Sequence, residues 1–168
     1  DFVSVDLRPG IHAVLSTFKR SVRKDLKKAE RNRVQCFYEQ SCDHLDDFLE
    51  IYQSTMDRKS AEIFYYFSED FFKALPRDVK GMFYFFYAKI DDEIVSCELV
   101  LQHGIYSHSF LGGTKQIALS SAVNPMLKYT IIQHMMSIGC EYFLLGGGYN
   151  ENDGILKFKK AYAPNGII

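Results

Sequence analysis

Apolar residues between positions 11 and 32 recur at intervals of three and four, which is the spacing of one helix face. The pattern predicts one continuous helix over residues 11–32. Its apolar stripe consists of Ile11, Leu15, Phe18, Val22, Leu26 and Ala29.

The next stretch predicts a strand and two helices. Residues 34–39, "VQCFYE", are typical of a strand, and Asp43 is the expected N-cap of a second helix. Ser68 is the expected N-cap of a third, short helix, "EDFFKAL", which Pro76 should end.

Three strand-like runs follow: "GMFYFFYAKI", "EIVSCELVLQ" and "GIYSHSFLGG". Asp91 and Asp92 predict a hairpin between the first two. Because "FYFFY" has no polar face, we expect this strand to be central and covered on both sides. A helix over about residues 123–138, a strand "CEYFLL" and a last short helix complete the pattern. The predicted fold class is α/β, with a mixed, largely antiparallel central sheet and flanking helices.

Length and composition narrow the picture. A chain of 168 residues with 47% hydrophobic residues is long enough for one domain, and its apolar runs are shorter than the roughly 20 residues of a membrane span. Because the first residue is Asp1, we expect a piece excised from a longer protein. The cysteines Cys36, Cys42, Cys97 and Cys140 form no CxxC pair, which favours reduced thiols in a cytoplasmic protein and no metal site.

The stretch "LLGGGYNENDGILKFKKAYAP", residues 144–164, contains three consecutive glycines, Gly146, Gly147 and Gly148. It matches neither GxxxxGK[ST] nor GxGxxG, since Glu151 stands where the third glycine of the second motif belongs. We therefore expect the glycines to let the chain leave a strand with positive φ.

Lysines are placed unusually in the same stretch. On a helix over about residues 153–162, Lys157 and Lys160 point away from the apolar arc, whereas Lys159 falls inside it. A lysine there either extends its ammonium past the edge of the arc or meets an anion in a cleft. Both readings stay open at this stage.

Basic residues crowd the first predicted helix, opposite its apolar stripe. Asp25 and Glu30 are the only acids between Lys19 and Arg33, so the charges are not paired off. The face is either simply solvated or serves an anionic partner such as phosphate, tRNA or a membrane surface. Its members are Lys19, Arg20, Arg23, Lys24, Lys27, Lys28 and Arg31.

Two further positions could carry chemistry. Glu98 shares one strand face with Ser96 and Val100, and is either a general base or a residue at the rim of the sheet. His108, in "SHS", has no acidic partner at useful spacing, so a catalytic triad is not indicated.

Taken together, "RKDLKKAERNRV", "IYQSTMDR", "SFLGGT", "NPMLKYTIIQHMMSIGCEYFLLGGG" and "DGILKFKKAYAP" resemble the second lobe of the Fem-type peptidyltransferases. These form a branch of the GNAT acyltransferase superfamily. The resemblance covers about residues 19–164 and implies a GNAT-like fold. It also implies transfer of an acyl or aminoacyl group to an amine, with aminoacyl-tRNA donating to a peptidoglycan precursor in the best-known members.

The resemblance also assigns residues. The family's Phe-Lys pair matches Phe158 and Lys159, and implies that Lys159 stabilises negative charge at the transfer site. The arginine of the basic helix matches Arg23, which implies a place near the diphosphate of a nucleotide-linked precursor. Lys159 is thus the expected catalytic residue. The expected substrate-binding residues are Arg23, Lys27, Gly146, Gly147, Gly148 and Phe158.

The expected organisation is one GNAT-like domain over residues 1–168. It comprises the basic helix at 11–32 and a core at 33–168 that stops before the last strands of a complete GNAT sheet. An N-terminal lobe of the same chain is the implied partner, alongside tRNA or a nucleotide-linked precursor.

The sequence departs from the GNAT pattern in the segment that binds the acyl donor acetyl-CoA. Acetyl-CoA-dependent members carry [QR]xxGx[GA], but here Gln116 is followed by Ala118 and Leu119 where glycines are expected. Aminoacyl-tRNA or an acyl-CoA remains as the donor. The alternatives are an acetyl-CoA-dependent N-acetyltransferase and a non-catalytic lobe that binds tRNA or another anion.

Overall fold

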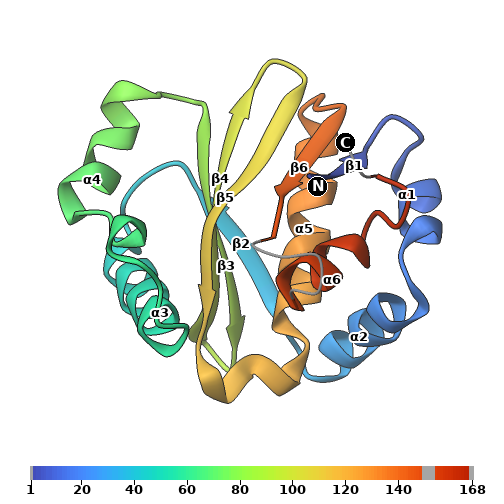
Figure 1. Cartoon of the computed structure of the whole chain (residues 1–168), viewed down its shortest axis with the longest axis horizontal. Helices are drawn as coiled ribbons and strands as arrows, with labels where there is room; N and C mark the ends of the chain where they lie inside the picture. Colours follow the sequence, from blue (N-terminus) through green and yellow to red (C-terminus); the bar gives the residue numbers. More distant parts are fainter. Residues whose placement is uncertain (1, 149–153, 167–168) are drawn as a thin grey trace.

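One six-stranded sheet organises the chain, in the strand order β1-β6-β5-β4-β3-β2 (Figure 1). The structure is a computed structural model that describes residues 2–148 and 154–166. All neighbouring strands are antiparallel except β5 and β6, which are parallel. The mixed, largely antiparallel sheet is therefore confirmed. The strands are β1 Val3–Asp6, β2 Gln35–Glu39, β3 Phe83–Ile90, β4 Glu93–His103, β5 Tyr106–Thr114 and β6 Tyr142–Gly146.

Helices cover both faces of this sheet. Figure 1 shows α3 and α4 on one side, and α1, α2, α5 and α6 on the other, so the layers are helix, sheet, helix. The helices are α1 Ile11–Thr17, α2 Arg20–Arg31, α3 Leu45–Arg58, α4 Glu69–Asp78, α5 Val123–Ser137 and α6 Gly154–Lys160. Two 3-10 helices, Ile63–Tyr65 (η1) and Gln116–Ser121 (η2), lie in the connections.

Each face has its own apolar core, and β3 contributes to both. Phe83, Phe85 and Tyr87 pack under α3 and α4. Tyr84 and Phe86 pack on the opposite side, with α5 and the N-terminal helices. The expectation that "FYFFY" is covered on both sides is confirmed, and β3 lies second from the β2 edge of the sheet.

The hairpin between β3 and β4 is also as predicted. Asp91 and Asp92 both have positive φ, 48° and 65°. Two consecutive left-handed residues are typical of a two-residue turn whose twist matches that of the strands. Aspartate tolerates this conformation better than most residues with a Cβ.

Strand β1 was not predicted from the sequence. It pairs antiparallel with β6, from Val3 opposite Gly146 to Asp6 opposite Tyr142. The backbone N–H of Ser4 also donates to the carbonyl of Gly166 at 2.7 Å, so the two ends of the described chain lie together. Its four residues are too few for an alternating pattern to stand out.

The single helix predicted over 11–32 is wrong. The chain forms α1 and α2, with Phe18 and Lys19 extended between them (ψ 142° and 150°). Phe18 is buried edge-to-face against Tyr162, with ring centroids 5.3 Å apart, and the N–H of Lys19 donates to the carbonyl of Ala161 at 2.8 Å. These tertiary contacts replace the helical hydrogen bonds that the apolar stripe alone would favour.

Two predicted helix boundaries are wrong as well. Helix α3 begins after His44, not Asp43, and the N–H of His44 donates to Glu39 Oε1 at 3.0 Å. Helix α4 begins after Ser68 as predicted, with the Ser68 hydroxyl accepting from the N–H of Phe71, but it continues through Pro76 to Asp78. Proline cannot donate to the carbonyl four residues earlier. That carbonyl, on Phe72, accepts from the Cys42 thiol at 3.7 Å instead.

Contact between α3 and β5 depends on Gly113. A Cβ at this position would lie 2.6 Å from Thr55 Oγ1 and 2.9 Å from the carbonyl oxygen of Ile51. Gly113→Ala should therefore push α3 from the sheet and lower the free energy of unfolding by about 1–3 kcal/mol. Urea denaturation measures this loss.

Gly154→Ala is the matched control for that experiment, because a Cβ on Gly154 meets nothing within 4 Å. Its effect should stay within about 0.5 kcal/mol. Equal stability of the two variants would contradict the close approach of α3 at Gly113.

No helix in the described part of the chain is long and apolar enough to cross a lipid bilayer.

All four cysteines are free thiols. Cys97 and Cys140 are buried among apolar side chains, where desolvation raises the pKa of each thiol. These two residues therefore act as small hydrophobic groups.

Candidate functional site

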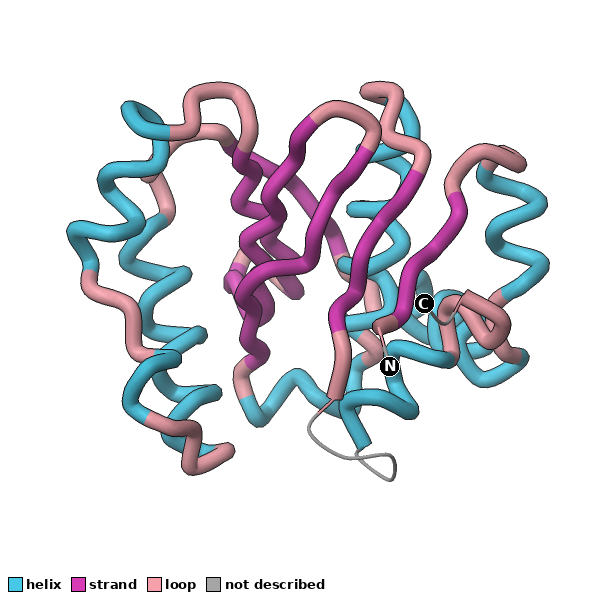
Figure 2. The backbone as a smooth tube through the Cα atoms, turned by 45° about the horizontal axis from the view of Figure 1, so that its top comes forward, coloured by secondary structure: helices cyan, strands magenta, loops and turns pink. Residues whose placement is uncertain are grey.

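Strands β5 and β6 pair only over their first residues, and the site lies where they separate. Their register runs from Tyr106 opposite Tyr142 to His108 opposite Leu144, although β5 continues to Thr114 (Figure 2). A cavity of about 170 Å³ lies toward the end of β5, enclosed by parts of α3, β4, η2, α5 and α6. Its described lining is Thr55, Arg58, Lys59, Ser96, Cys97, Glu98, Gly112, Gly113, Thr114, Leu119, Asn124, Leu127, Lys128 and Phe158.

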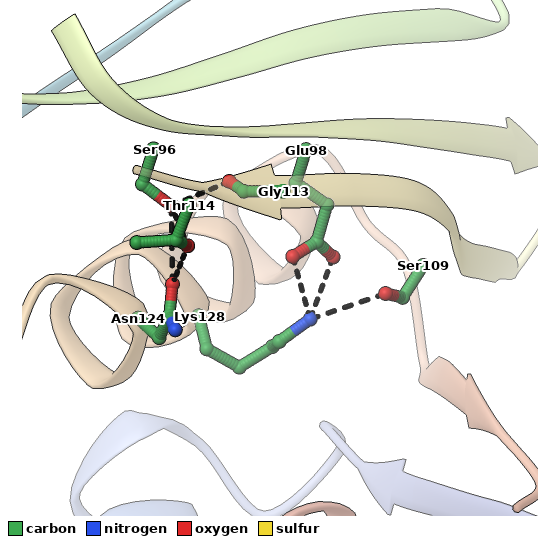
Figure 3. A network of polar contacts seen from close by, with 7 residues as sticks. All are labelled: Ser96, Glu98, Ser109, Gly113, Thr114, Asn124 and Lys128. Carbon is green, nitrogen blue, oxygen red and sulfur yellow. Dashed lines mark hydrogen bonds and ion pairs between the residues drawn. The ribbon is translucent and has the colours of Figure 1, made fainter. Parts of the chain in front are cut away.

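A buried ion pair forms one wall of this cavity (Figure 3). The Lys128 ammonium on α5 donates to both carboxylate oxygens of Glu98 on β4, at 2.7 and 2.6 Å. It also donates to the Ser109 hydroxyl at 3.1 Å. Glu98 is therefore not at a solvated rim, and its charge is compensated inside the fold.

A second polar group surrounds the Asn124 side chain. Its Oδ1 accepts from the hydroxyls of Ser96, at 3.1 Å, and Thr114, at 2.5 Å (Figure 3). The two hydroxyls are 2.8 Å apart, and that of Ser96 also contacts the carbonyl of Gly113 at 3.0 Å. With its oxygen held by two hydroxyls, the carboxamide directs its NH₂ group away from them. An amide NH₂ carries two donors, which suit a carbonyl or carboxylate oxygen.

Helix α3 supplies the third wall. The Thr55 hydroxyl accepts from the N–H of Thr114 at 3.0 Å, and Arg58 Nη2 donates to the carbonyl of Thr114 at 3.0 Å. These bonds join the end of α3 to the end of β5. Arg58 is exposed, so it places a guanidinium at the mouth of the cavity.

Helix α6 brings in the residues predicted from the glycine-rich stretch. Phe158 lines the cavity, and the half-buried Lys159 donates from Nζ to the carbonyl of Gly147 at 2.7 Å. Gly146 ends β6 with φ +79°, and a Cβ there would lie 3.3 Å from Lys159 Nζ. The positive φ expected of the glycines is thus confirmed at Gly146. Lys159, Gly146 and Gly147 come together, while Gly148 is exposed just after them.

His108 lies close to this lysine. Burial lowers the pKa of His108 below its usual value, and the positive charges of Lys159 and Lys128 lower it further, against a raising effect of Glu98. The imidazole is therefore neutral near pH 7. The pKa of His108 is therefore lower in the folded protein than in the unfolded chain. Its contribution to folding stability is fully present above the ordinary pKa of histidine and is lost as the pH falls through the pKa of the folded state.

We predict that Lys159→Ala raises the pKa of His108, because it removes the second-largest lowering effect. The midpoint of the His108 ring-proton titration, followed by NMR, measures this shift. His134 serves as an internal control: burial alone lowers its pKa, so its midpoint should not move. Equal shifts at both histidines, or none at His108, would contradict the proximity of Lys159.

Arg23 and Lys27 do not meet the other predicted site residues. Both are exposed on α2, and neither is among the residues that line the cavity. The apolar stripe of α2, with Val22, Leu26 and Ala29, is buried as predicted. The basic face of α2 is thus a separate surface.

Two residues of the cavity lining, Lys128 and Asn124, were not predicted from the sequence, although the position of Lys128 could have indicated a site. Lys128 interrupts the apolar run "NPMLKYTII", and a lysine among residues that a helix buries indicates a partner or a site. Asn124 gave no such signal in the sequence, because an asparagine at the start of a helix is ordinary.

In residues 2–148 and 154–166, no three His, Cys, Asp or Glu side chains gather as ligands for a metal ion.

Solved structures share this fold. FemX matches with a TM-score of 0.85 and 14% identity, over 96% of this chain and 57% of that chain. L-PGS from Bacillus licheniformis matches with a TM-score of 0.69 and 18% identity, over 96% and 55%. The aminoglycoside acetyltransferase meta-AAC0020, from an uncultured soil metagenomic sample, matches with a TM-score of 0.60 and 14% identity, over 78% and 88%.

The chain spans about half the length of FemX and of L-PGS. At these identities the matches establish the fold, and the predicted GNAT-like architecture is confirmed by it. The search of curated proteins gave no match. The acetyltransferase (GNAT) domain family matches residues 16–160, which is most of the sequence. The chain therefore belongs to the GNAT acetyltransferase domain family.

Proposed function

We propose that this domain belongs to a longer Fem-type enzyme that transfers an aminoacyl group to an amine of a peptide acceptor. The observation that carries the proposal is the cavity near the separation of β5 and β6, with Phe158 in its wall and Lys159 at the adjoining glycines. The domain's similarity to FemX over 96% of its length supports the same branch. A second lobe, outside this chain, is part of the proposal.

Aminoacyl transfer to an amine requires few catalytic groups from the site. The amine nitrogen attacks the acyl carbon, the ester bond of the donor breaks, and the amine loses a proton as the leaving alkoxide gains one. A neutral amine needs little further activation, so the site mainly positions it and stabilises the oxyanion that develops. In this proposal Lys159 supplies positive charge to the oxyanion, and the Asn124 NH₂ group orients the acyl carbonyl.

The region after β5 bears on the donor. Residues 116–121, where acetyl-CoA-dependent members carry glycines, form the 3-10 helix η2 with apolar Ile117 and Leu119 exposed. Ala122 then adopts a left-handed conformation before α5. We favour aminoacyl-tRNA over acetyl-CoA on this ground, and assign Arg23 and Lys27 on α2 to phosphates of the donor or of a nucleotide-linked precursor.

A donor competition assay tests this proposal. The full-length protein is incubated with a lysine-containing peptide acceptor and either radiolabelled aminoacyl-tRNA or labelled acetyl-CoA. Label should enter the peptide from aminoacyl-tRNA alone. Transfer from acetyl-CoA alone would establish the N-acetyltransferase alternative, and binding of tRNA without transfer from either donor would establish the non-catalytic one.

A further inference from the structure

The 3-10 helix η2 turns two aliphatic side chains toward the solvent. Ala118 is buried and anchors η2 to the fold, whereas Ile117 is 75% exposed and Leu119, which also lines the cavity, is 49% exposed. Single exposed apolar residues are ordinary on a protein surface, but two on one short helix form an apolar patch. Such a patch is stabilised by contact with an apolar environment.

A row of side chains leads along α2 to this patch. Lys24, Lys28 and Asn32 follow one another at intervals of four residues, which places them on one side of the helix. The Asn32 side chain donates to the carbonyl of Ser121, the last residue of η2, at 3.1 Å. Four residues of a 3-10 helix span about 8 Å, so Ile117 lies near the end of the row. Figure 1 shows the end of α2 and the segment between β5 and α5 together at the lower edge of the molecule.

The basic side chains on this side of α2 are not neutralised within the described chain. Lys24, Lys28 and Arg31 are exposed, and none of them forms an ion pair with a described residue. Glu30 is the exposed acid of α2, but it lies about 160° around the helix from Lys28. The row therefore presents uncompensated positive charge to the solvent.

Most acidic side chains near the start of η2 are already paired. Lys115, which directly precedes η2, forms ion pairs with Glu50 and Glu93 at 3.5 and 3.0 Å. In the adjoining turn between β3 and β4, Asp92 is in an ion pair and the exposed Asp91 is not. One such negative charge does not offset the three cations of α2. An anionic partner is therefore favoured beside the apolar patch.

The apolar patch distinguishes between two kinds of anionic partner. Phosphates of RNA and of lipid headgroups both attract lysine and arginine. The bases of RNA are bound by stacking on aromatic rings or guanidinium planes, which aliphatic side chains do not provide. An anionic bilayer offers both complements, because its acyl chains lie directly beneath the charged headgroups. Cations beside exposed aliphatic side chains therefore favour a lipid surface.

We propose that this side of the domain docks on an anionic lipid bilayer. The cations lie among the headgroups, and the aliphatic side chains enter the upper part of the acyl-chain region. Arg23 and Lys27, which the proposed function assigns to ligand phosphates, form a different row of α2. The inference therefore goes beyond the proposed function and does not depend on its reaction. The docking surface consists of Lys24, Lys28, Arg31, Ile117 and Leu119.

Sedimentation of the full-length protein with lipid vesicles tests this surface. One set of vesicles is phosphatidylcholine alone, and the other contains about one third phosphatidylglycerol. Each lysine or arginine near an anionic membrane strengthens binding about five-fold, so three should strengthen it about 100-fold over phosphatidylcholine. The preference should fall as salt is added, because ions screen the attraction.

Substitutions assign the binding to the docking surface. Lys28→Gln should weaken binding to the anionic vesicles about five-fold, whereas Lys80→Gln, at an exposed lysine between α4 and β3, should leave it unchanged. Ile117→Ser should weaken binding about ten-fold, because the side chain no longer enters the acyl chains. Ile63→Ser is its matched control, since Ile63 is 85% exposed but lies on η1, and it should have no effect.

Three results would overturn the inference. The first is equal binding of the full-length protein to both kinds of vesicle, and the second is a Lys28 or Ile117 variant that loses no more than its control. The third comes from filter binding of tRNA to the same variants: weaker tRNA binding in Lys28→Gln with unchanged vesicle binding would assign the row to RNA. Aminoacyl transfer is measured separately, so intact transfer without vesicle binding would reject the docking surface alone.

Discussion

Replacing Lys159 by alanine in the full-length protein should abolish acyl transfer while leaving the fold intact. The Lys159 ammonium is held at the carbonyl of Gly147 beside the end of β6, one residue from Phe158 in the cavity wall. Loss of one group that stabilises an oxyanion lowers kcat by about 10²- to 10³-fold. Single-turnover transfer from aminoacyl-tRNA measures this, and urea denaturation of the same variant checks its stability.

Lys157→Ala is the matched control, since Lys157 lies on the same helix with its side chain exposed. It removes the same charge and should retain wild-type turnover. Wild-type turnover in Lys159→Ala would remove this lysine from the mechanism. Equal losses in both variants would show that the charge of α6 matters only for overall binding of an anionic donor.

The second large effect concerns stability and the ion pair. Lys128→Met leaves the Glu98 carboxylate without its partner in a site where both side chains are about 10% exposed or less. Removing one member of a buried pair costs about 3–5 kcal/mol, because the remaining charge is uncompensated. The free energy of unfolding, measured by urea denaturation at pH 7, should fall by that amount.

Glu98→Leu combined with Lys128→Met should recover most of this loss, because apolar replacement of a whole buried pair is often neutral. The two single variants and the double variant form a cycle that isolates the coupling energy. A loss below about 1 kcal/mol in Lys128→Met would mean that water in the cavity solvates Glu98, as it does an exposed ion pair.

Local patterns predicted the parts of the fold that local interactions determine. The turn at Asp91 and Asp92, the N-cap at Ser68 and the two-sided burial of "FYFFY" depend on neighbouring residues, and the structure has all three. The errors arose where distant residues decide. The apolar stripe over 11–32 continues through Phe18, yet a hydrogen bond from Lys19 to Ala161 interrupts the helix there.

The candidate site shows the same division. The sequence singled out Lys159 by its position on one short helix and Phe158 through the resemblance to the Fem-type enzymes. The structure places Phe158 in the cavity wall and Lys159 at the carbonyl of Gly147. The sequence also singled out Glu98, but the partner Lys128 is 30 residues away and its approach depends on how α5 packs on the sheet. Periodicity along a chain carries no information on such a pairing, so the buried ion pair of Glu98 and Lys128 emerged only in three dimensions.

The extended joint between α1 and α2 has a mechanical consequence. Phe18 packs on Tyr162 and the N–H of Lys19 bonds to Ala161, so α2 begins against the segment that directly follows α6. Helix α6 in turn carries Phe158 into the cavity wall, with its ring 5.2 Å from that of Tyr162. The start of α2 and the helix that carries Phe158 are therefore fixed against each other through Tyr162 and Ala161, so a substitution that loosens this contact should disturb the position of both helices.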